Sequence, residues 1–441
     1  MMKKVNLKLK ILTQEDDLIQ NLSEFSTSVA TDVEVTKTVS QILSEIRERG
    51  DQALLEKTKL FDRADLNADD LLVKEDEMRK SLNSLSEEEE LSLKQAIQNI
   101  TTFHEQSKPS DWSFSNNHGA HVGEKYYPIK RIGLYVPGGN VPLVSTVLMT
   151  ATLAKVAQVP EIAVVTPPNE KGKIAPQLLA ALKLLEVSEV YSVGGAQAIG
   201  ALAYGTNTIP PVDKIFGPGN AYVNEAKRQV FGVVGVDLLP GPSEVMVIAD
   251  ETANPKFVAT ALLAQAEHGS GKEKTYLLCS EKSLFVQIEN EIKLQLETLS
   301  HRSAIEKVLQ HGLRAIWISD LTRLSEIANF IAPEHLELQV SEEKLDFFMS
   351  EITTAGAMLL GHHSPTALGD FVAGPSHVLP TGRSGRFSSG LRLHDFIRRT
   401  SFIKYDMDSL KAARDASTCF SRMERLDGHG QSIELRLNSI R

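Results

Sequence analysis

Apolar and polar positions follow two different rhythms on either side of residue 130. Before it, apolar residues recur at helical spacing in residues 39–47 and in a second amphipathic run that begins at Ser86. Ser86 and Glu89 have the spacing of a capping box, in which two side chains satisfy free N–H groups at the start of a helix. We therefore expect residues 34–133 to be helical.

After residue 130, short apolar runs alternate with glycine turns and helical stretches. The strand-like runs form two series, before and after residue 240, and cover residues 131–140, 161–168, 190–195, 244–250, 275–280, 315–319 and 355–361. Strands that alternate with helices usually pair in parallel and carry helices on both faces. The pattern predicts an α/β protein with two Rossmann-like parallel-sheet domains.

The length of the chain also indicates more than one domain. With 441 residues it is long for a single hydrophobic core, and we expect one domain to be inserted in the other. We predict an inserted domain at residues 134–245 and an enclosing domain made of residues 34–133 and 246–390. Residues 1–33 are then a small N-terminal segment. The tail, residues 391–441, is rich in arginine and helical in pattern, without the rhythm of a strand.

Composition and charge narrow the class of partners. The hydrophobic fraction of 42% and the charged fraction of 24% are ordinary for a soluble globular protein. The net charge is −10 and no basic run is interleaved with aromatic residues, so we expect no nucleic-acid partner. The sequence shows no secretory signal and no run of about 18 apolar residues, so we expect no membrane segment. Cys279 and Cys419 are too few for a disulfide framework and favour a reducing compartment, which predicts a cytoplasmic protein.

The first candidate for chemistry is the end of a predicted helix over residues 254–269. Asn254 is its expected N-cap and Gly269 its expected stop. Gln265 and His268 lie three residues apart in the last turn, on one face of the helix. This pair can bind a ligand, or His268 can simply interact with the negative end of the helix dipole. The spacing leaves both interpretations open.

Further ionisable residues and glycine turns accompany this pair. Short segments flanked by glycine or proline hold Glu334, His335, Asp370, His377 and His429. In α/β proteins, polar residues in short turns after strands often carry the chemistry. Glycine turns within residues 193–200 and 215–220 can approach a phosphate or serve only as tight turns, and no Gly-x-Gly-x-x-Gly sequence is present.

Six short motifs carry a family resemblance. In chain order they are Tyr-Val-Pro-Gly-Gly from residue 135, Gly-Gly-Ala-Gln-Ala-Ile from 194, Pro-Gly-Pro-Ser-Glu from 240, Gln-Ala-Glu-His from 265, Ala-Pro-Glu-His-Leu-Glu from 332 and Ala-Gly-Pro-Ser-His-Val-Leu-Pro-Thr-Gly from 373. With them the chain resembles the histidinol dehydrogenases over nearly its whole length. The resemblance implies a zinc-containing, NAD-dependent enzyme that oxidises L-histidinol through L-histidinal to L-histidine, the last step of histidine biosynthesis.

The resemblance also implies roles for individual residues. The implied zinc ligands are Gln265, His268, Asp370 and His429. The implied catalytic residues are Glu334, which activates water, and His335, the base for the alcohol and the hydrate. The zinc ligands and His335 also contact the substrate, together with Ser243, His377 and Glu424. The implied NAD contacts are Tyr135, Gln197 and Asn220.

The implied zinc site combines three neutral ligands with one carboxylate. Its formal charge is near +1, so the zinc keeps Lewis acidity, and we expect it mainly to orient the substrate. Residues 134–245 would then bind NAD, and the enclosing domain would carry the zinc. Because Glu424 and His429 lie in the tail, far along the chain from the other ligands, the resemblance also implies a homodimer whose tails complete the sites of the partner subunits.

Two other functions fit the same residues. In a zinc hydrolase, Glu334 would activate water and the glycine turns would be structural, which leaves the doubled α/β architecture without a use. A non-catalytic relative would bind only a metal or a small ligand, although every matched catalytic position carries the residue type that catalysis requires.

Overall fold

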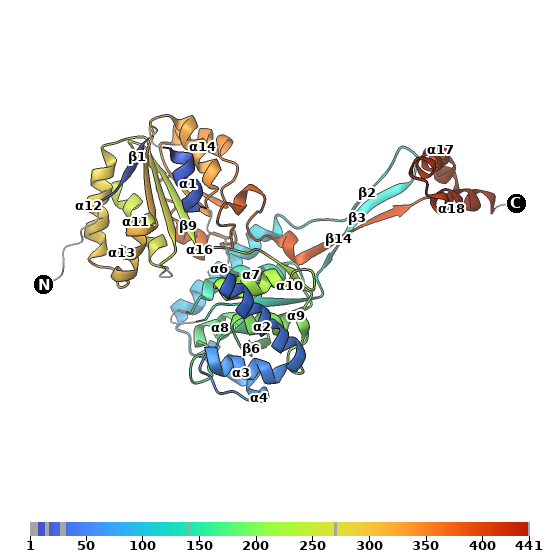
Figure 1. Cartoon of the computed structure of the whole chain (residues 1–441), viewed down its shortest axis with the longest axis horizontal. Coiled ribbons are helices and arrows are strands. Elements are labelled where there is room, and N and C mark those ends of the chain that lie inside the picture. Colours follow the sequence, from blue (N-terminus) through green and yellow to red (C-terminus); the bar gives the residue numbers. More distant parts are fainter. Residues whose placement is uncertain (1–7, 14–16, 27–31, 139–141, 269–270, 440–441) are drawn as a thin grey trace.

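The chain folds into two α/β units and an arm that projects from them (Figure 1). The structure is a computed structural model that describes residues 8–13, 17–26, 32–138, 142–268 and 271–439. Two parallel sheets covered by helices confirm the predicted fold class. None of the described helices is both long and apolar enough to cross a membrane.

The first unit is built on a six-stranded parallel sheet. In spatial order its strands are β1 Ile11–Thr13, β11 Leu313–Trp317, β10 Lys274–Cys279, β9 Glu244–Ala249, β12 His335–Gln339 and β13 Ala357–Leu360. Its helices are α1 Leu18–Ser26, α11 Pro255–Ala266, α12 Leu284–Leu296, α13 Arg302–His311, α14 Leu321–Ile331, α15 Glu342–Glu351 and α16 Thr366–Phe371. Val245 and Val247 of β9 join the core on one face of the sheet, and Met246 and Ile248 join the core on the other. The sheet is therefore buried on both faces.

The second unit is built on a five-stranded parallel sheet. In spatial order its strands are β6 Glu189–Ser192, β5 Glu161–Thr166, β4 Arg131–Tyr135, β7 Lys214–Phe216 and β8 Gly235–Val236. The helices that follow these strands are α7 Val144–Val156, α8 Pro176–Leu184, α9 Gly195–Tyr204 and α10 Ala221–Val230. The strand order reverses at β4, because β5 and β6 lie on one side of it and β7 and β8 on the other. Such a switch point leaves a crevice at the carboxyl ends of the strands, where α/β proteins bind ligands.

The N-terminal helices pack on the second unit, which differs from the predicted division of residues 34–133. These helices are α2 Val33–Arg49, α3 Asp51–Phe61, α4 Ala68–Leu71, α5 Glu75–Asn83 and α6 Glu87–Glu105. Leu43 and Ile46 of α2 lie against α9, where a side-chain carbon on Gly200 would meet both within 3.4 Å. Ile100 of α6 shares a core with α7 and α8. The amphipathic pattern shows that a helix face is buried, but it does not say against which sheet.

Two helix starts agree with their sequence signals. Ser86 and Glu89 form the predicted capping box at the start of α6. Asn254 caps α11 by accepting a hydrogen bond from the N–H of Lys256. The predicted stop of that helix, Gly269, lies outside the described residues.

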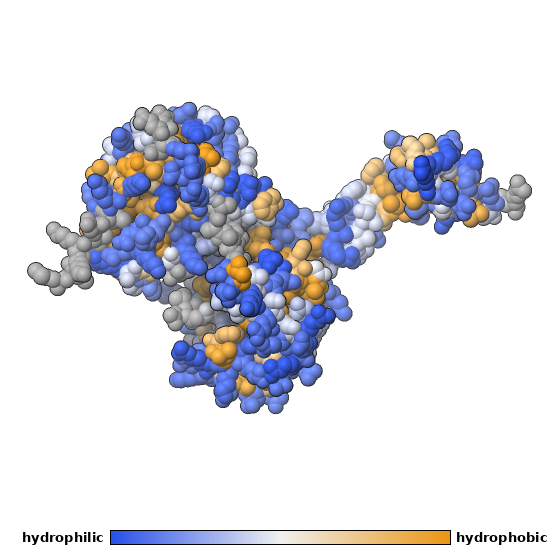
Figure 2. All heavy atoms as spheres, in the orientation of Figure 1, coloured by the Kyte–Doolittle hydropathy of each residue, from blue (hydrophilic) through white to orange (hydrophobic). Residues whose placement is uncertain are grey.

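The arm is an antiparallel sheet that ends in two helices, and it corrects two predictions. Its strands are β2 Trp112–Ser115, β3 His121–Pro128 and β14 Ile397–Lys404, and its helices are α17 Met407–Glu424 and α18 Asp427–Asn438. Residues 112–128 are therefore not helical, and the tail does contain a strand. These strands are largely exposed and lack the apolar pattern of a buried strand. Large apolar side chains on the arm surface include Phe114, Ile403 and Phe420, which are 55%, 72% and 60% exposed (Figure 2).

A short connection joins the carboxyl edge of the second sheet to the amino edge of the first. β8 ends at Val236 and β9 begins at Glu244, so only residues 237–243 lie between them. Asp237, in this connection, accepts a hydrogen bond from the N–H of Gly217 at 2.7 Å. Because so short a segment spans less than about 30 Å, these two edges lie near each other.

Candidate active site

Glu334 and His335 lie where β12 begins. Helix α14 ends at Ile331, Ala332 turns the chain with a φ of 50°, and His335 is the first residue of the strand. Glu334 and His335 are buried, with exposed fractions of 7% and 6%. Sequence reasoning looked for such residues in turns after strands. These two instead precede their strand, at the amino edge of the first sheet.

Asp370 and His377 complete a cluster around this pair. His335 Nε2 lies 3.3 Å from Asp370 Oδ1, and His335 Nδ1 lies 3.9 Å from Glu334 Oε2. His377 Nδ1 lies 2.9 Å from the backbone oxygen of Asp370. The structure therefore brings together four of the predicted site residues, from β12, α16 and the segment that follows α16.

Burial and mutual charge set the protonation of this cluster. Burial works to lower the pKa of His335, but the carboxylates of Asp370 and Glu334 outweigh it and raise that pKa to about 9. Burial raises the pKa of Glu334 against the attraction of His335. Burial also works to raise the pKa of Asp370, but its hydrogen bond with His335 outweighs this and holds the pKa low. A general base must start neutral, so His335 Nε2 can pair with Asp370 or accept a substrate proton, but not both at once.

Gln265 and His268 lie at the end of α11, near the same cluster. Gln265 is 3% exposed, and its Nε2 has no hydrogen-bond partner within the part of the chain that the structure describes. His268 lies close enough for its charge to lower the pKa values of both Asp370 and Glu334. A buried amide without a partner, next to an imidazole and a carboxylate, is a donor set that suits a divalent cation.

Ser243 and Glu244 lie at the start of β9, beside Glu334. The backbone oxygen of Ser243 accepts a hydrogen bond from the N–H of Lys274 at 3.0 Å. The N–H of Glu244 donates to Glu334 Oε2 at 2.7 Å, and Glu244 Oε1 lies 3.8 Å from Lys274 Nζ. Sequence reasoning missed Glu244 and Lys274, because a charged residue at the end of an apolar run usually marks the return to solvent. Glu244 also ends the motif Pro-Gly-Pro-Ser-Glu, but the resemblance assigns a role only to Ser243 of that motif, and the remaining signal is that two apolar runs begin with opposite charges.

Glu424 and His429 lie on the arm and not in this cluster. Glu424 is the last residue of α17, His429 lies in α18, and both are exposed. Figure 1 shows these helices at the far end of the arm, away from α11 and α16. Within one chain the structure does not bring His429 to the other three predicted ligands. Among the described residues, no group of three or more His, Cys, Asp or Glu side chains is arranged to hold a metal.

Tyr135, Gln197 and Asn220, the predicted NAD contacts, lie at the carboxyl edge of the second sheet. Tyr135 ends β4, and its hydroxyl accepts a hydrogen bond from the N–H of Gly195 at 3.2 Å. Gln197, in the first turn of α9, is 1% exposed, and its Nε2 lies 3.4 Å from Asp62 Oδ2. Asn220 caps α10, where its side chain accepts hydrogen bonds from the N–H groups of Tyr222 and Val223. The structure therefore places all three at the switch point of the sheet.

The backbone at this edge is closely packed and lined by helix N-termini. Gly217 has a φ of 111°, and a side-chain carbon there would lie 2.0 Å from the backbone oxygen of Tyr135. Helices α9 and α10 both begin at this edge, so their free N–H groups favour an anion such as a phosphate. Asp62, which sequence reasoning missed, adds a carboxylate whose pKa burial raises to about 6. No motif marks Asp62, because it directly follows α3, far along the chain from the glycine turns.

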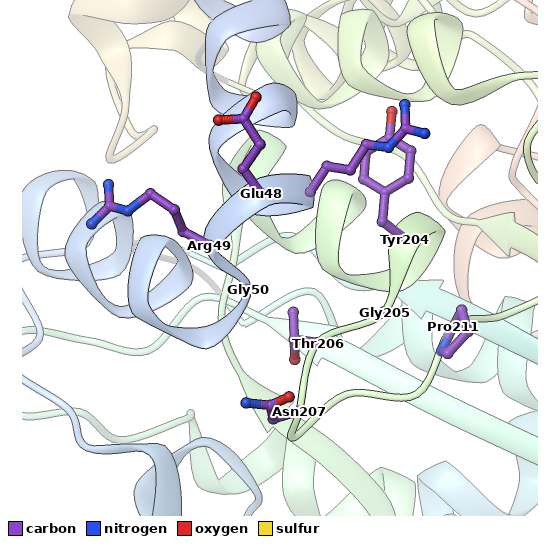
Figure 3. Close-up of a pocket in the computed structure, with 9 residues that line it drawn as sticks. Glu48, Arg49, Gly50, Tyr204, Gly205, Thr206, Asn207 and Pro211 are labelled. Carbon is purple, nitrogen blue, oxygen red and sulfur yellow. The ribbon is translucent and has the colours of Figure 1, made fainter.

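An open cavity of about 480 Å³ lies elsewhere on the second unit (Figure 3). It lies between the end of α2 and the loop that follows α9, and its lining includes Arg47, Arg49, Tyr204 and Thr206. None of the predicted site residues lines this cavity, so it is separate from the candidate active site.

Comparison with known proteins gives the family. A family model described as histidinol dehydrogenase matches residues 26–437. A histidinol dehydrogenase of Nitrosomonas europaea is 42% identical over 435 residues, which cover 98% of this chain and 99% of the relative. One of Bradyrhizobium diazoefficiens is 44% identical and covers 93% of this chain and 94% of the relative. The crystal structure of histidinol dehydrogenase from Elizabethkingia anophelis matches with a TM-score of 0.92 and 34% identity, covering 99% of this chain and all of that one. With matches that include both α/β units and the arm, the chain belongs to the histidinol dehydrogenase family, the dehydrogenases of histidine biosynthesis.

Proposed function

We propose that this chain oxidises L-histidinol through L-histidinal to L-histidine by two successive hydride transfers to NAD, the last step of histidine biosynthesis. The observation that carries the proposal is the meeting of two chemically different sheet edges across the short connection of residues 237–243. The oxidation of an alcohol to an acid needs a base, an activated water and a hydride acceptor, and the two edges provide a place for each. We place the activity in the cytoplasm, which the free thiols of Cys279 and Cys419 support.

The residues at the first edge fit a zinc ion. The buried amide of Gln265 has no partner among the described residues, and His268 and the Asp370 carboxylate lie near it. We propose that these three side chains hold zinc and that His429 of the partner subunit is the fourth ligand. When bound, zinc supplies Lewis acidity and orients the substrate.

The residues at the second edge fit the phosphates and sugars of NAD. Two helix N-termini meet there, and Tyr135, Gln197 and Asn220 line the same switch point. When bound, NAD supplies the hydride acceptor. The chain has no Gly-x-Gly-x-x-Gly sequence, so we propose that other glycine turns bring the backbone close to the cofactor. At Gly217 the backbone is packed so closely that a side-chain carbon would lie 2.0 Å from the oxygen of Tyr135.

Two neighbouring residues divide the proton transfers. His335 takes the proton of the alcohol in the first oxidation and that of the hydrate in the second, once its Nε2 no longer pairs with Asp370. Glu334 takes the proton of the water that adds to the aldehyde. Its burial makes it a stronger base than an exposed glutamate, and the N–H of Glu244 fixes its orientation.

Substrate selection uses residues around this pair. His377 contacts the backbone of Asp370 and, with Ser243, lies beside the cluster. Glu424 carries a carboxylate, which is the natural partner of the substrate ammonium. We propose that all three bind L-histidinol.

The arm supports a homodimer in which each subunit completes the site of the other. It carries Glu424 and His429 far from the cluster of their own chain (Figure 1). It also exposes large apolar side chains, such as Ile403 and Phe420, as a surface that a second subunit would cover (Figure 2). We propose that the arm, which holds β2 and β3 and most of the predicted tail of residues 391–441 from β14 onward, is exchanged between two subunits.

The stoichiometry of NADH formation tests the proposal. The purified protein is incubated with L-histidinol and excess NAD, and NADH is counted per substrate consumed, before and after the metal is removed with a chelator. We expect two NADH per histidinol, loss of activity on chelation and recovery with zinc. One NADH would mean an alcohol dehydrogenase that releases the aldehyde. Absence of NADH from a zinc-loaded dimer would reject the proposal in favour of a hydrolase or a binding protein.

A further inference from the structure

Four buried ionisable side chains form a row along the amino edge of the first sheet. The adjacent strands β10, β9 and β12 begin with Lys274, Glu244 and His335, and Glu334 immediately precedes β12. Lys274 is in register with Glu244, and His335 is in register with Val245. The exposed fractions of Glu244 and Lys274 are only 1% and 5%. Burial of an ion pair costs desolvation free energy, whereas apolar residues in the same place would not carry this cost. A contribution to stability alone therefore does not explain why Glu244 and Lys274 are buried here.

Glu244 contacts Glu334 through its backbone, and its side chain holds that backbone in place. The N–H of Glu244 donates to Glu334 Oε2 at 2.7 Å. Glu244 Oε1 lies 3.8 Å from Lys274 Nζ, and Oε2 accepts a hydrogen bond from the N–H of Gly382 at 3.3 Å. Lys274 Nζ in turn donates to the backbone oxygen of Ser26 at 3.1 Å. The side chain of Glu244 therefore fixes the amide that orients Glu334.

Burial and the charge of Lys274 have opposite effects on the pKa of Glu244. Burial raises the pKa of Glu244 to about 8, Lys274 opposes this rise, and the carboxylate of Glu334 adds to it. Two buried carboxylates so close together resist being ionised at the same time. The ammonium of Lys274 offsets one of the two charges, which leaves Glu334 able to exchange a proton.

We propose that Glu244 and Lys274 are a positioning pair for Glu334 that serves the addition of water to the aldehyde and not the oxidation of the alcohol. This inference rests on the proposed function. In the step concerned, an O–H bond of water breaks and its proton goes to Glu334, while the water oxygen bonds to the aldehyde carbon. The carbonyl oxygen takes the displaced electron pair and then a proton from solvent, which gives the hydrate. His335, the base for the alcohol, touches Glu244 only through the backbone of that residue, and its Nε2 has a carboxylate partner of its own in Asp370, at 3.3 Å.

Two half-reactions of the full-length, zinc-loaded protein test this pair. Oxidation of L-histidinal with NAD needs the added water, whereas reduction of L-histidinal with NADH reverses the alcohol step and does not. For Glu244→Gln we expect the oxidation to slow by roughly tenfold to hundredfold, because a misplaced base loses much of its contribution. We expect the reduction to change by less than about threefold, because its base, His335, is held at Nε2 by Asp370, which the substitution leaves in place. For Lys274→Met we also expect a slower oxidation and a nearly unchanged reduction. Lys274→Arg keeps the charge, so we expect its oxidation rate to lie between those of Lys274→Met and the wild type.

A matched pair at the other end of β9 provides the control. Asp250 is 1% exposed, and its Oδ2 lies 2.8 Å from Lys344 Nζ. Asp250→Asn also breaks a buried ion pair of the first sheet, but far from Glu334, so it is expected to lower the melting temperature and leave the ratio of the two half-reactions unchanged. Equal losses in both half-reactions for Glu244→Gln and Lys274→Met, or no loss beyond that of Asp250→Asn, would overturn the inference. A wild-type protein that performs neither half-reaction would instead reject the proposed function.

Discussion

The two parallel sheets place their functional residues at opposite ends of their strands. In the second sheet, Tyr135 ends β4, and helices α9 and α10 begin beyond the strands, so the carboxyl edge collects helix N-termini. In the first sheet, Glu334 and His335 precede β12, and α11 ends nearby with Gln265 in its last turn. The amino edge therefore collects strand starts and a helix C-terminus.

The difference matches the charge of the ligand that we propose for each edge. Helix N-termini favour anions and helix C-termini favour cations, so the second sheet suits the phosphates of a dinucleotide and the first suits a metal ion. Residues 237–243 join the two edges directly. Under the proposed function, unlike ends of two sheets would bring a cation and a phosphate close to each other.

The largest expected effect comes from removal of the proton acceptor at the first edge. Glu334→Gln keeps the shape of the side chain but cannot take the proton of water, so we expect kcat for histidine formation to fall by roughly 10²–10⁴-fold. Zinc content and NAD affinity are expected to stay unchanged, because neither ligand depends on this carboxylate. Steady-state kinetics, metal analysis and calorimetric titration of one sample measure all three. Retained turnover would contradict the role of Glu334, and lost NAD binding would contradict the separation of the edges.

A smaller effect is expected from loss of a metal ligand at the same edge. Gln265→Ala removes the buried amide at the end of α11, and we expect the affinity for zinc to fall by at least about tenfold. Gln41→Ala, which removes an exposed glutamine of α2 that bonds to Glu45, serves as the control. Competition with a chromophoric chelator measures both variants. Equal zinc affinities in the two variants would rule out Gln265 as a ligand.

Two matched helix caps compare the edges directly. Asn220→Ala removes the cap of α10 in the second unit, and Asn254→Ala removes the cap of α11 in the first. Each variant is expected to lose about 1 kcal/mol of unfolding free energy. Only Asn220→Ala is expected to weaken NAD binding, because α10 begins at the carboxyl edge. Urea denaturation and NAD titration check these outcomes, and equal loss of NAD affinity in both variants would show that the caps act only through stability.

The smallest expected effect on stability at neutral pH comes from substitution of a buried histidine of the second unit. His104 of α6 is 2% exposed, and neither ring nitrogen has a hydrogen-bond partner in the described ranges. Burial lowers its pKa from the usual 6.5 to about 4, whereas the paired His335 of the first unit is raised to about 9. Between pH 6.5 and 4, His104 is protonated in the unfolded chain but stays neutral in the folded chain. The stability that neutral His104 contributes to the folded state is therefore complete above pH 6.5 and is lost as the pH falls to 4.

The variant His104→Leu tests this assignment. It cannot be protonated, so the loss of stability on acidification is expected to be smaller than in the wild type. Urea denaturation at pH 7 and pH 5 measures the difference. An identical pH dependence in both proteins would show that other groups cause it.

Buried strands could be predicted from the sequence, and exposed or charged ones could not. β9 and β10 are largely apolar in their interiors, with Thr275 as a polar exception, because both faces of the sheet are covered. β12 contains Glu337, and this charged residue interrupts the apolar pattern that would predict a buried strand. In the structure Glu337 is buried, and its carboxylate accepts hydrogen bonds from Thr366. β14 is exposed along most of its length, so no apolar pattern marks it.

The residues of the site could be predicted from motifs, but their partners could not. The motifs contain His335 and His377, a glycine-flanked segment contains Asp370, and the structure brings these three residues together. Glu244 and Asp62 became visible only in three dimensions, because their importance comes from what lies beside them. The sequence also does not show which sheet edges meet in space. A residue that precedes a strand of one sheet can therefore lie close to a residue that follows a strand of the other sheet without any sign in the spacing.

The affinity for NAD before and after removal of zinc tests most directly the claim that the two edges bind their ligands separately. Calorimetric titration of NAD into the zinc-loaded dimer and into the same dimer stripped with a chelator gives the two dissociation constants. We expect the two dissociation constants to agree within about twofold, which corresponds to little coupling between the sites, and we expect turnover to be lost in the stripped sample. Loss of NAD binding on removal of zinc, with the melting temperature and the dimer retained, would contradict this expectation.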